Sequence, residues 1–263
     1  MLALIAGEGA LPGIVRDAYS GELRVCELEG HRSELREVDV THFRIERLGS
    51  FIQNLKSDGI TKVCFAGAIA RPALDPSLVD PPTMKLVPRL MQALQSGDDG
   101  ALRAVIEFFE EAGLTVVASH ELATDLLPAP GVLSHVEPSA QDEKDAVRGD
   151  EILAAMGGVD LGQACVVVGG QALALETIAG TDWMMRSLLH RDAFLPKGGL
   201  FMKASKPAQD RRIDMPTIGP DTFARAAEVG LSGVVIEAGG VQVLSLERCL
   251  EIANTHNLLF WVR

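Results

Sequence analysis

Four basic side chains and two carboxylates lie close together in the stretch Lys203–Gly219, which reads KASKPAQDRRIDMPTIG. The cations are Lys203, Lys206, Arg211 and Arg212, and the carboxylates are Asp210 and Asp214. Clustered cations suit an anionic ligand, and a carboxylate among them suits a divalent cation or a proton transfer. The stretch predicts an active site, although a solvated basic loop before a helix explains the charges alone equally well.

A second group of polar residues, Glu176 followed by Thr181 and Asp182, precedes a segment with helical spacing over residues 183–189. Thr181 or Asp182 could cap that helix by accepting a hydrogen bond from its first turn. Alternatively, both side chains face a ligand at the helix start, and Glu176 supplies a further carboxylate. The sequence leaves these two interpretations open.

The N-terminal segment predicts a strand, a glycine turn and a helix. The apolar run Leu2–Ala6 is followed by Gly7, Glu8 and Gly9, and backbone N–H groups in such a turn can hold a phosphate. The GxGxxG fingerprint is incomplete because residue 12 is proline, so a turn made for tight packing is as good an interpretation. Arg71 follows another predicted strand, where ligands of open α/β sheets collect, and is a candidate anion contact unless it is an exposed loop residue.

Alternating strands and helices over the first half of the chain predict a Rossmann-like parallel sheet. Strands are expected over residues 2–6, 23–28, 43–48, 61–66 and 114–118. The proline-rich stretch 126–138 predicts a boundary, which gives an N-terminal domain over 1–128, a linker over 129–138 and a C-terminal catalytic domain over 139–263. The Gly169-Gly170 pair between two apolar runs predicts a hairpin in that mixed α/β domain.

Composition limits the functional classes. A formal net charge of −12 argues against general nucleic-acid binding, which needs a large basic face. The four cysteines are far apart, as expected in a reducing compartment, and show no zinc-binding spacing. Neither a signal peptide nor a transmembrane helix is expected, because no basic leader or apolar run of about 18 residues occurs.

Five stretches of the chain, in the same order, resemble the LpxI-type UDP-2,3-diacylglucosamine pyrophosphatases of lipid A biosynthesis. The most specific are AGTD, which includes Thr181 and Asp182, and KASKPAQDRRIDMPTIG. The others are AGEGALP, CFAGAIARP and GLSGVVIEAG.

The resemblance implies two domains with the ligand between them and a Mg2+-dependent hydrolase. Its substrate would be UDP-2,3-diacylglucosamine, cleaved to UMP and 2,3-diacylglucosamine 1-phosphate (lipid X) by attack of water on the α-phosphorus. Asp214 and Asp182 would be the catalytic and metal-binding residues, and Asp214 is either a metal ligand or a general base. Because Glu8 would repel a phosphate, direct contact by the N-terminal turn is a weaker expectation.

Substrate binding is expected from a set of residues that match the family motifs or carry suitable charge: Gly7, Gly9, Arg71, Thr181, Lys203, Lys206, Arg212 and Thr217. The resemblance further implies a homodimer in the cytoplasm, with at most peripheral contact at the inner face of the inner membrane. Two other functions fit the residues alone. One is a nucleotide-dependent oxidoreductase, and the other is a non-catalytic nucleotide- or lipid-binding protein.

Overall fold

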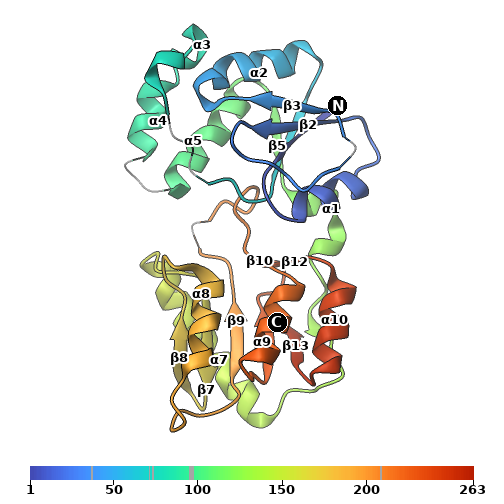
Figure 1. Ribbon diagram of the computed structural model, residues 1–263, viewed down its shortest axis with the longest axis vertical. Helices are drawn as coiled ribbons and strands as arrows, with labels where there is room; N and C mark the ends of the chain where they lie inside the picture. Colours follow the sequence, from blue (N-terminus) through green and yellow to red (C-terminus); the bar gives the residue numbers. More distant parts are fainter. Residues whose placement is uncertain (37, 71, 73, 95–97, 208) are drawn as a thin grey trace. The chain divides into compact units, whose positions relative to one another are not determined.

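The computed structural model describes residues 1–36, 38–70, 72, 74–94, 98–207 and 209–263 (Figure 1). The chain folds into two compact units. Unit 1 comprises Met1–Thr124 together with Asp210–Asp214, and unit 2 comprises Asp125–Gln209 together with Met215–Arg263. None of the helices in the described parts of the chain is long and apolar enough to cross a bilayer.

Unit 1 is built on a parallel five-stranded sheet with the order β3-β2-β1-β4-β5. This order matches five of the six strands of the Rossmann order 3-2-1-4-5-6, so the predicted Rossmann-like fold is confirmed. The strands are β1 (Leu2–Ala6), β2 (Leu23–Leu28), β3 (Val40–Phe43), β4 (Lys62–Ala66) and β5 (Thr115–Val117). All five residues of β1 are buried, as expected of a central strand that is covered on both faces.

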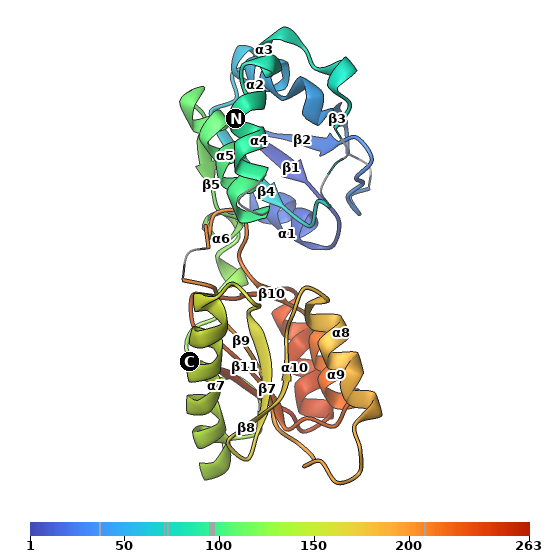
Figure 2. The ribbon, with the colours of Figure 1, turned by 90° about the vertical axis from the view of Figure 1, so that its left-hand side faces the viewer.

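Helices cover both faces of the unit 1 sheet (Figures 1 and 2). One face packs against α2 (Leu48–Ser57), α4 (Val87–Leu94) and α5 (Asp98–Glu111), and the other against α1 (Leu11–Ala18) and α6 (Ser119–Leu122). Shorter pieces complete the unit: η1 (Ile45–Arg47), η2 (Pro76–Leu78) and α3 (Pro81–Met84), with η3 (Thr124–Leu126) at the point where unit 2 begins.

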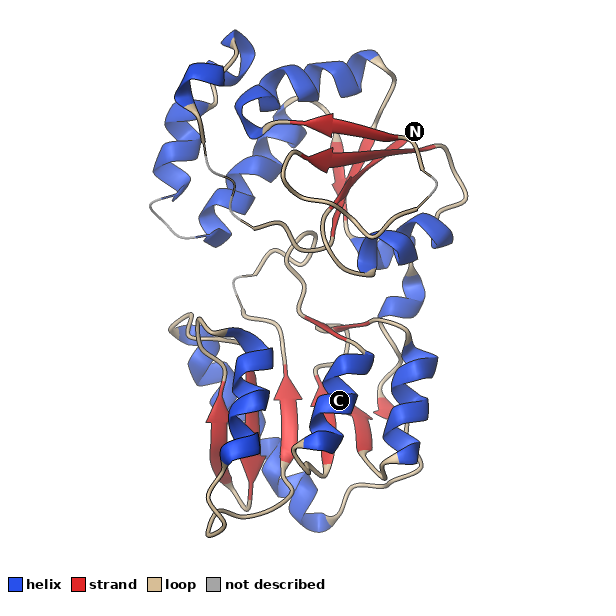
Figure 3. Ribbon diagram, viewed as in Figure 1, coloured by secondary structure: helices blue, strands red, loops and turns tan. Residues whose placement is uncertain are grey.

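Unit 2 contains a mixed six-stranded sheet with the order β6-β13-β11-β9-β7-β8 (Figure 3). Its parallel centre is β9 (Leu200–Lys203), β11 (Gly233–Ile236) and β13 (Leu259–Val262). The antiparallel strands are β6 (Gly131–Val132), β7 (Ala164–Val168) and β8 (Gln171–Leu175). A separate parallel pair is formed by β10 (Thr217–Ile218) and β12 (Gln242–Val243).

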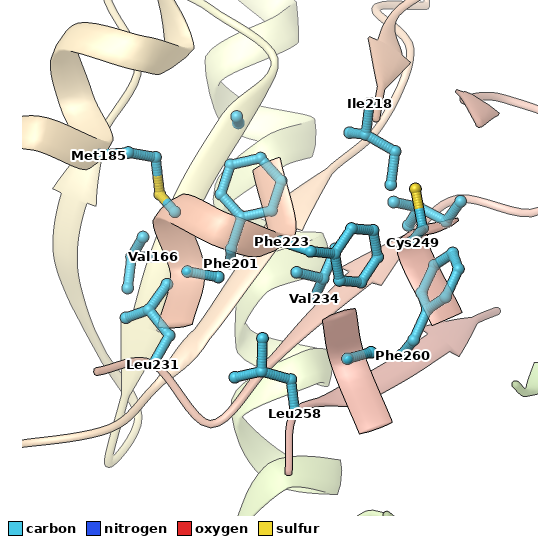
Figure 4. Packing of buried hydrophobic residues seen from close by; sticks show 14 of the residues in the cluster. Val166, Met185, Phe201, Ile218, Phe223, Leu231, Val234, Cys249, Leu258 and Phe260 are labelled. Atoms are coloured by element: carbon cyan, nitrogen blue, oxygen red, sulfur yellow. The ribbon is translucent and has the colours of Figure 1, made fainter. Parts of the chain in front are cut away.

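The sheet of unit 2 has α7 (Ala140–Gly158) on one face and three helices on the other (Figure 2). These three are α8 (Gly180–Ser187), α9 (Pro220–Glu228) and α10 (Leu246–Thr255), and η4 (Leu188–His190) extends α8. Phe223 and Phe260 meet edge to face in the core beneath them, with ring centroids 4.7 Å apart (Figure 4). This aromatic contact packs α9 against β13 in the core of unit 2.

Local sequence signals account for several of these elements. Gly169 and Gly170 both have positive φ, as a type I′ turn requires, and they join β7 to β8 as predicted. Ser139 and Asp142 form a capping box at the start of α7. Pro220 occupies the first turn of α9, where its missing N–H costs nothing.

Two expectations differ from the structure. The strand expected over residues 43–48 is wrong, because β3 ends at Phe43 and the chain then turns through η1 into α2. Leu48 is buried as the first residue of α2, so its apolar character serves a helix. Within the stretch expected as a linker, Gly131 and Val132 form β6 and pair with β13.

Candidate active site

A chain of hydrogen bonds in unit 2 joins three charged or polar side chains of the predicted site. The Lys203 ammonium donates to Thr181 Oγ1 over 3.1 Å and to the carbonyl oxygen of Thr217 over 3.2 Å. The Thr181 hydroxyl in turn donates to Glu176 Oε1. The hydroxyl therefore links a cation to a carboxylate, and the direction of its proton is fixed by the acceptor.

Four elements place these groups at one edge of the sheet. Glu176 directly follows β8, Thr181 lies in the first turn of α8, Lys203 ends β9 and Thr217 begins β10. Lys203 ends a parallel strand, and ligands of open α/β sheets collect beyond such ends. A ligand at these strand ends stays a prediction.

Lys203 and Glu176 are almost completely buried, with exposed fractions of 8% and 7%. Buried charges are tolerated in proteins when they are paired and hydrogen-bonded. Glu176 meets this condition with a second bond, because its Oε2 accepts the backbone N–H of Gln163 over 2.8 Å. Gly162 makes this approach possible, since a Cβ there would lie 2.5 Å from the carbonyl oxygen of Glu176.

Of the two interpretations of Thr181 and Asp182, the structure contradicts capping of α8. The helix begins at Gly180, and its N-cap residue is Ala179, so Thr181 and Asp182 lie inside the first turn. The Thr181 hydroxyl is engaged with Glu176 and Lys203 instead. The Asp182 side chain is exposed, and its carboxylate is stabilised at the positive end of the helix dipole.

The segment Asp210–Asp214 belongs to unit 1 and holds a second charged cluster. The Arg212 guanidinium binds Asp210 in a fork, with Nε 3.0 Å from Oδ1 and Nη2 2.7 Å from Oδ2. Its Nη1 donates to Glu110 over 2.6 Å. These hydrogen bonds hold the pKa of the Asp210 carboxyl below its usual range and raise the pKa of Arg212.

The sequence predicts that Arg212 neutralises a phosphate, but in the structure two carboxylates already occupy its guanidinium. An anionic ligand would therefore have to displace Glu110 or Asp210.

Asp214 lies half-buried at the end of this segment, and its backbone N–H donates to the carbonyl oxygen of Asp210 over 3.1 Å. Its predicted catalytic role stays a prediction.

The remaining predicted contacts have different surroundings. Lys206 Nζ lies 2.7 Å from Asp160 Oδ1, in an ion pair within unit 2. Gly7 and Glu8 donate their backbone N–H groups to Ala66 and Ala68, so those two donors are used by the fold. Gly9 has a φ of +89°, which the turn requires of it. Arg71 lies outside the described residues.

The tight packing of the N-terminal turn supports its structural interpretation. A Cβ at Gly7 would lie 2.5 Å from the carbonyl oxygen of Ala68, so the glycine allows two loops to pass closely. The exposed Glu8 lies between the two glycines. Phosphate binding by Gly7 and Gly9 therefore stays a prediction with a weaker physical basis than the role of Lys203.

The carboxylates that the structure describes do not form a ready-made metal cage. In the described parts of the chain, no three His, Cys, Asp or Glu side chains are grouped closely enough to hold a metal ion. Mg2+ commonly takes only one or two protein carboxylates and completes its shell with water and substrate phosphates. Asp182 in unit 2 and Asp214 in unit 1 each carry a carboxylate that can donate oxygen ligands in this way, and their metal binding stays a prediction.

Sequence reasoning missed two polar residues near Lys203. Gln163 begins the turn into β7, and its backbone anchors Glu176, yet an isolated glutamine carries no signal of its own. Arg263 follows β13 and pairs with Asp150 of α7 at 3.0 Å. Both line the same cavity as Lys203, because β7 is the neighbour of β9 on one side and β13 is separated from β9 on the other side by β11 alone.

Together, the fold and the site define a two-unit α/β protein. One unit is Rossmann-like, and the other holds a buried lysine–threonine–glutamate chain at the edge of its sheet. The chain belongs to the LpxI family, because the LpxI N-terminal domain matches residues 1–126 and the LpxI C-terminal domain matches residues 129–261. It is 34% identical over 266 residues to a protein of Caulobacter vibrioides named UDP-2,3-diacylglucosamine pyrophosphatase LpxI. That match covers 96% of this chain and 94% of the relative.

Proposed function

We propose that the protein hydrolyses UDP-2,3-diacylglucosamine to UMP and 2,3-diacylglucosamine 1-phosphate, a step of lipid A biosynthesis. The observation that carries the proposal is the Lys203–Thr181–Glu176 chain of hydrogen bonds, which lies in the part of the chain that matches the LpxI C-terminal domain. The 34% identity to a relative with this named activity, over nearly its full length, supports the same substrate.

Diphosphate hydrolysis depends mainly on positioning and on neutralising charge that spreads over phosphate oxygens. Lys203 supplies a positive charge whose position is fixed by Thr181 and by the carbonyl oxygen of Thr217. Glu176 keeps the Thr181 hydroxyl oriented so that its lone pairs face the ammonium. These residues bind and orient the diphosphate without being consumed in the reaction.

In the proposed reaction a water oxygen forms a bond to the α-phosphorus, on the uridine side. The bond from that phosphorus to the bridging oxygen breaks, and the sugar 1-phosphate leaves. Water enriched in 18O distinguishes this route, because the label is then found in UMP. Label in the sugar 1-phosphate would refute attack on the α-phosphorus.

We also propose dependence on Mg2+, which would neutralise phosphate charge and acidify a bound water. Asp182 and Asp214 are the carboxylates proposed to supply its oxygen ligands. Asp214 is either such a ligand or a general base, and a substitution separates these roles. Asp214→Asn keeps a ligand oxygen but cannot accept a proton, so activity restored by excess Mg2+ in this variant would favour the ligand role.

The direct test is UMP release from UDP-2,3-diacylglucosamine with and without Mg2+. Wild-type protein should release UMP, and Asp214→Ala should reduce the rate by on the order of 100- to 1,000-fold. Full activity in Asp214→Ala would refute the site assignment, and no release by the wild type would refute the function. Absorbance of a bound nicotinamide cofactor in the purified protein would instead support an oxidoreductase.

The assembly and location are proposals based on the family resemblance. The protein would act as a homodimer in the cytoplasm, with peripheral contact at the inner face of the inner membrane, where its lipid substrate lies. Light scattering during size-exclusion chromatography measures the mass in solution, and a monomer at assay concentration would refute the dimer. Fractionation of cells at low and high salt measures the membrane contact.

A further inference from the structure

A cavity of about 380 Å3 opens in unit 2 where β9 and β11 end, against the C-terminal half of α7. Sites for small molecules typically enclose about 300–1,000 Å3, so the space suits one ring-sized ligand with its substituents. Apolar side chains and polar groups both line it. The apolar residues include Leu153, Met202 and Val235, and the polar ones include Gln163, Glu237 and Arg263.

Two buried polar atoms in the cavity wall lack hydrogen-bond partners among the described residues: Gln163 Oε1 and Arg263 Nη1. Arg263 Nη1 is 3.0 Å from Asp150 Oδ2, so the charges are paired, but the N–H direction does not meet hydrogen-bond geometry. A buried polar group without a partner is unfavourable, and such groups in native proteins usually have a function or bind a ligand. One acceptor and one donor therefore line the same cavity.

Two carboxylates complete the polar wall. Glu237 follows β11, and its Oε2 accepts the backbone N–H of Ser205 over 2.9 Å, which fixes the side chain. Asp150 lies on α7, and burial raises the pKa of its carboxyl. The positive charge of Arg263 lowers this pKa in part, and the negative charge of Glu237 raises it further. Carboxylates, an amide and a guanidinium beside apolar surface are the groups that bind a hydroxylated ring, whose edge is polar and whose faces are largely apolar.

We propose that this cavity binds a hydroxylated sugar ring, with Gln163 Oε1 accepting a hydrogen bond from a ring hydroxyl and Arg263 Nη1 donating one to a ring oxygen. Lys203 and Lys206 line the same cavity, so a phosphate attached to the ring has cations next to it. The source of the ring rests on the proposed function, whose substrate contains both a ribose and a glucosamine. The two sugars share the chemistry, and the experiment below distinguishes them.

Trp261 provides a local reporter, because the Arg263 guanidinium carbon lies 4.9 Å from the centre of its ring. The chain has two tryptophans, so Trp183→Phe leaves Trp261 as the single fluorophore of that kind. This variant is titrated with UMP and, separately, with glucosamine 1-phosphate. We expect a saturable fluorescence change with one of the two, which identifies the sugar bound in the cavity.

Gln163→Met, added to the reporter variant, keeps the volume of the side chain and removes the amide. Loss of one hydrogen bond should weaken binding of the identified compound by about five- to ten-fold. Gln171→Met is the matched control, since Gln171 is exposed on β8, outside the lining of the cavity, and this change should leave the affinity unaltered. Without ligand, Gln163→Met should unfold at the same urea concentration as the reporter variant, or a higher one, because it removes a buried acceptor that has no partner.

The proposal is overturned if neither compound changes the Trp261 fluorescence, if Gln163→Met binds as tightly as the control, or if it markedly lowers stability. The titration does not depend on hydrolysis. A wild type that releases no UMP but still shows binding lost in Gln163→Met refutes the proposed function and keeps the cavity as a sugar site. Normal UMP release with Gln163→Met unaffected in binding and in KM refutes the cavity alone.

Discussion

Thr181→Val tests the buried chain of hydrogen bonds with a change of a single atom's chemistry. Valine has nearly the shape of threonine, so the variant removes the hydroxyl and leaves the packing in place. Two charge-assisted hydrogen bonds are lost, one from Lys203 and one to Glu176. Lys203 keeps its bond to the Thr217 carbonyl oxygen, and Glu176 keeps the bond from the Gln163 N–H.

The expected loss of stability follows from the two hydrogen bonds that the variant lacks. Hydrogen bonds to charged groups contribute about 1.5–3 kcal/mol each, and both partners are more than nine-tenths buried. The two bonds together predict a decrease of at least about 3 kcal/mol in the free energy of unfolding of unit 2. Lys203 also loses the contact that orients its ammonium, so UMP release should fall by roughly ten-fold or more.

Urea denaturation and the UMP assay measure the two effects on the same preparations. Thr177→Val is the matched control, because Thr177 is exposed in the same turn and its hydroxyl accepts a 3.4 Å contact from the Ala179 backbone N–H. Thr181→Ser restores the hydroxyl and should recover most of both losses. Equal effects of the Thr177 and Thr181 valine variants, or no effect of Thr181→Val, would refute the reasoning.

Three further predictions concern groups outside that chain. Hydrogen bonds from Arg212 lower the pKa of the Asp210 carboxyl in the folded protein. The ionised carboxylate therefore stabilises the fold above about pH 4, and this stabilisation is lost as the pH falls through the pKa of the folded state. Urea denaturation at decreasing pH should show the free energies of unfolding of wild type and Asp210→Asn converging in acid. Burial raises the pKa of all four cysteines to about 12, so a thiol reagent at pH 8 should modify them only in denaturant, as mass spectrometry would show. Gly162→Ala should destabilise the protein by several kcal/mol in urea denaturation, because the new Cβ would lie 2.5 Å from a backbone oxygen. Gly158→Ala should be neutral or slightly stabilising in the same experiment, because a Cβ at residue 158 would have no atom within 4 Å.

Most elements of the fold are predictable from local sequence, because their turns and helix starts need particular residue types. The hairpin at Gly169 and Gly170 needs positive φ, and the α9 start needs only Pro220 in its first turn. The expected strand over residues 43–48 is wrong because apolar residues at that density fit either a strand or the start of a helix. Its conformation depends on η1 and α2 packing onto the sheet, which is tertiary information.

The polar groups of the site are predictable in kind and only partly in arrangement. Lys203 and Thr181 are both candidates from the sequence, and the structure joins them by a hydrogen bond. The direction of the Thr181 hydroxyl is not predictable, since a threonine at a helix start most often caps it. Gln163 cannot be identified from the sequence, because its place in the cavity wall depends on which strands are neighbours in the sheet.

The stretch Lys203–Gly219 is continuous in sequence but is divided by its packing. Lys203 and Thr217 pack within unit 2, whereas Asp210–Asp214 packs with unit 1 through residues such as Glu110. Substitutions at its two kinds of positions should therefore act on different compact units, with Thr181 or Lys203 variants destabilising unit 2 and Asp210 or Arg212 variants destabilising unit 1. A motif that looks like one loop in the sequence thus joins two separately packed parts of the chain, and its charged residues cannot be assigned one shared role from their spacing alone.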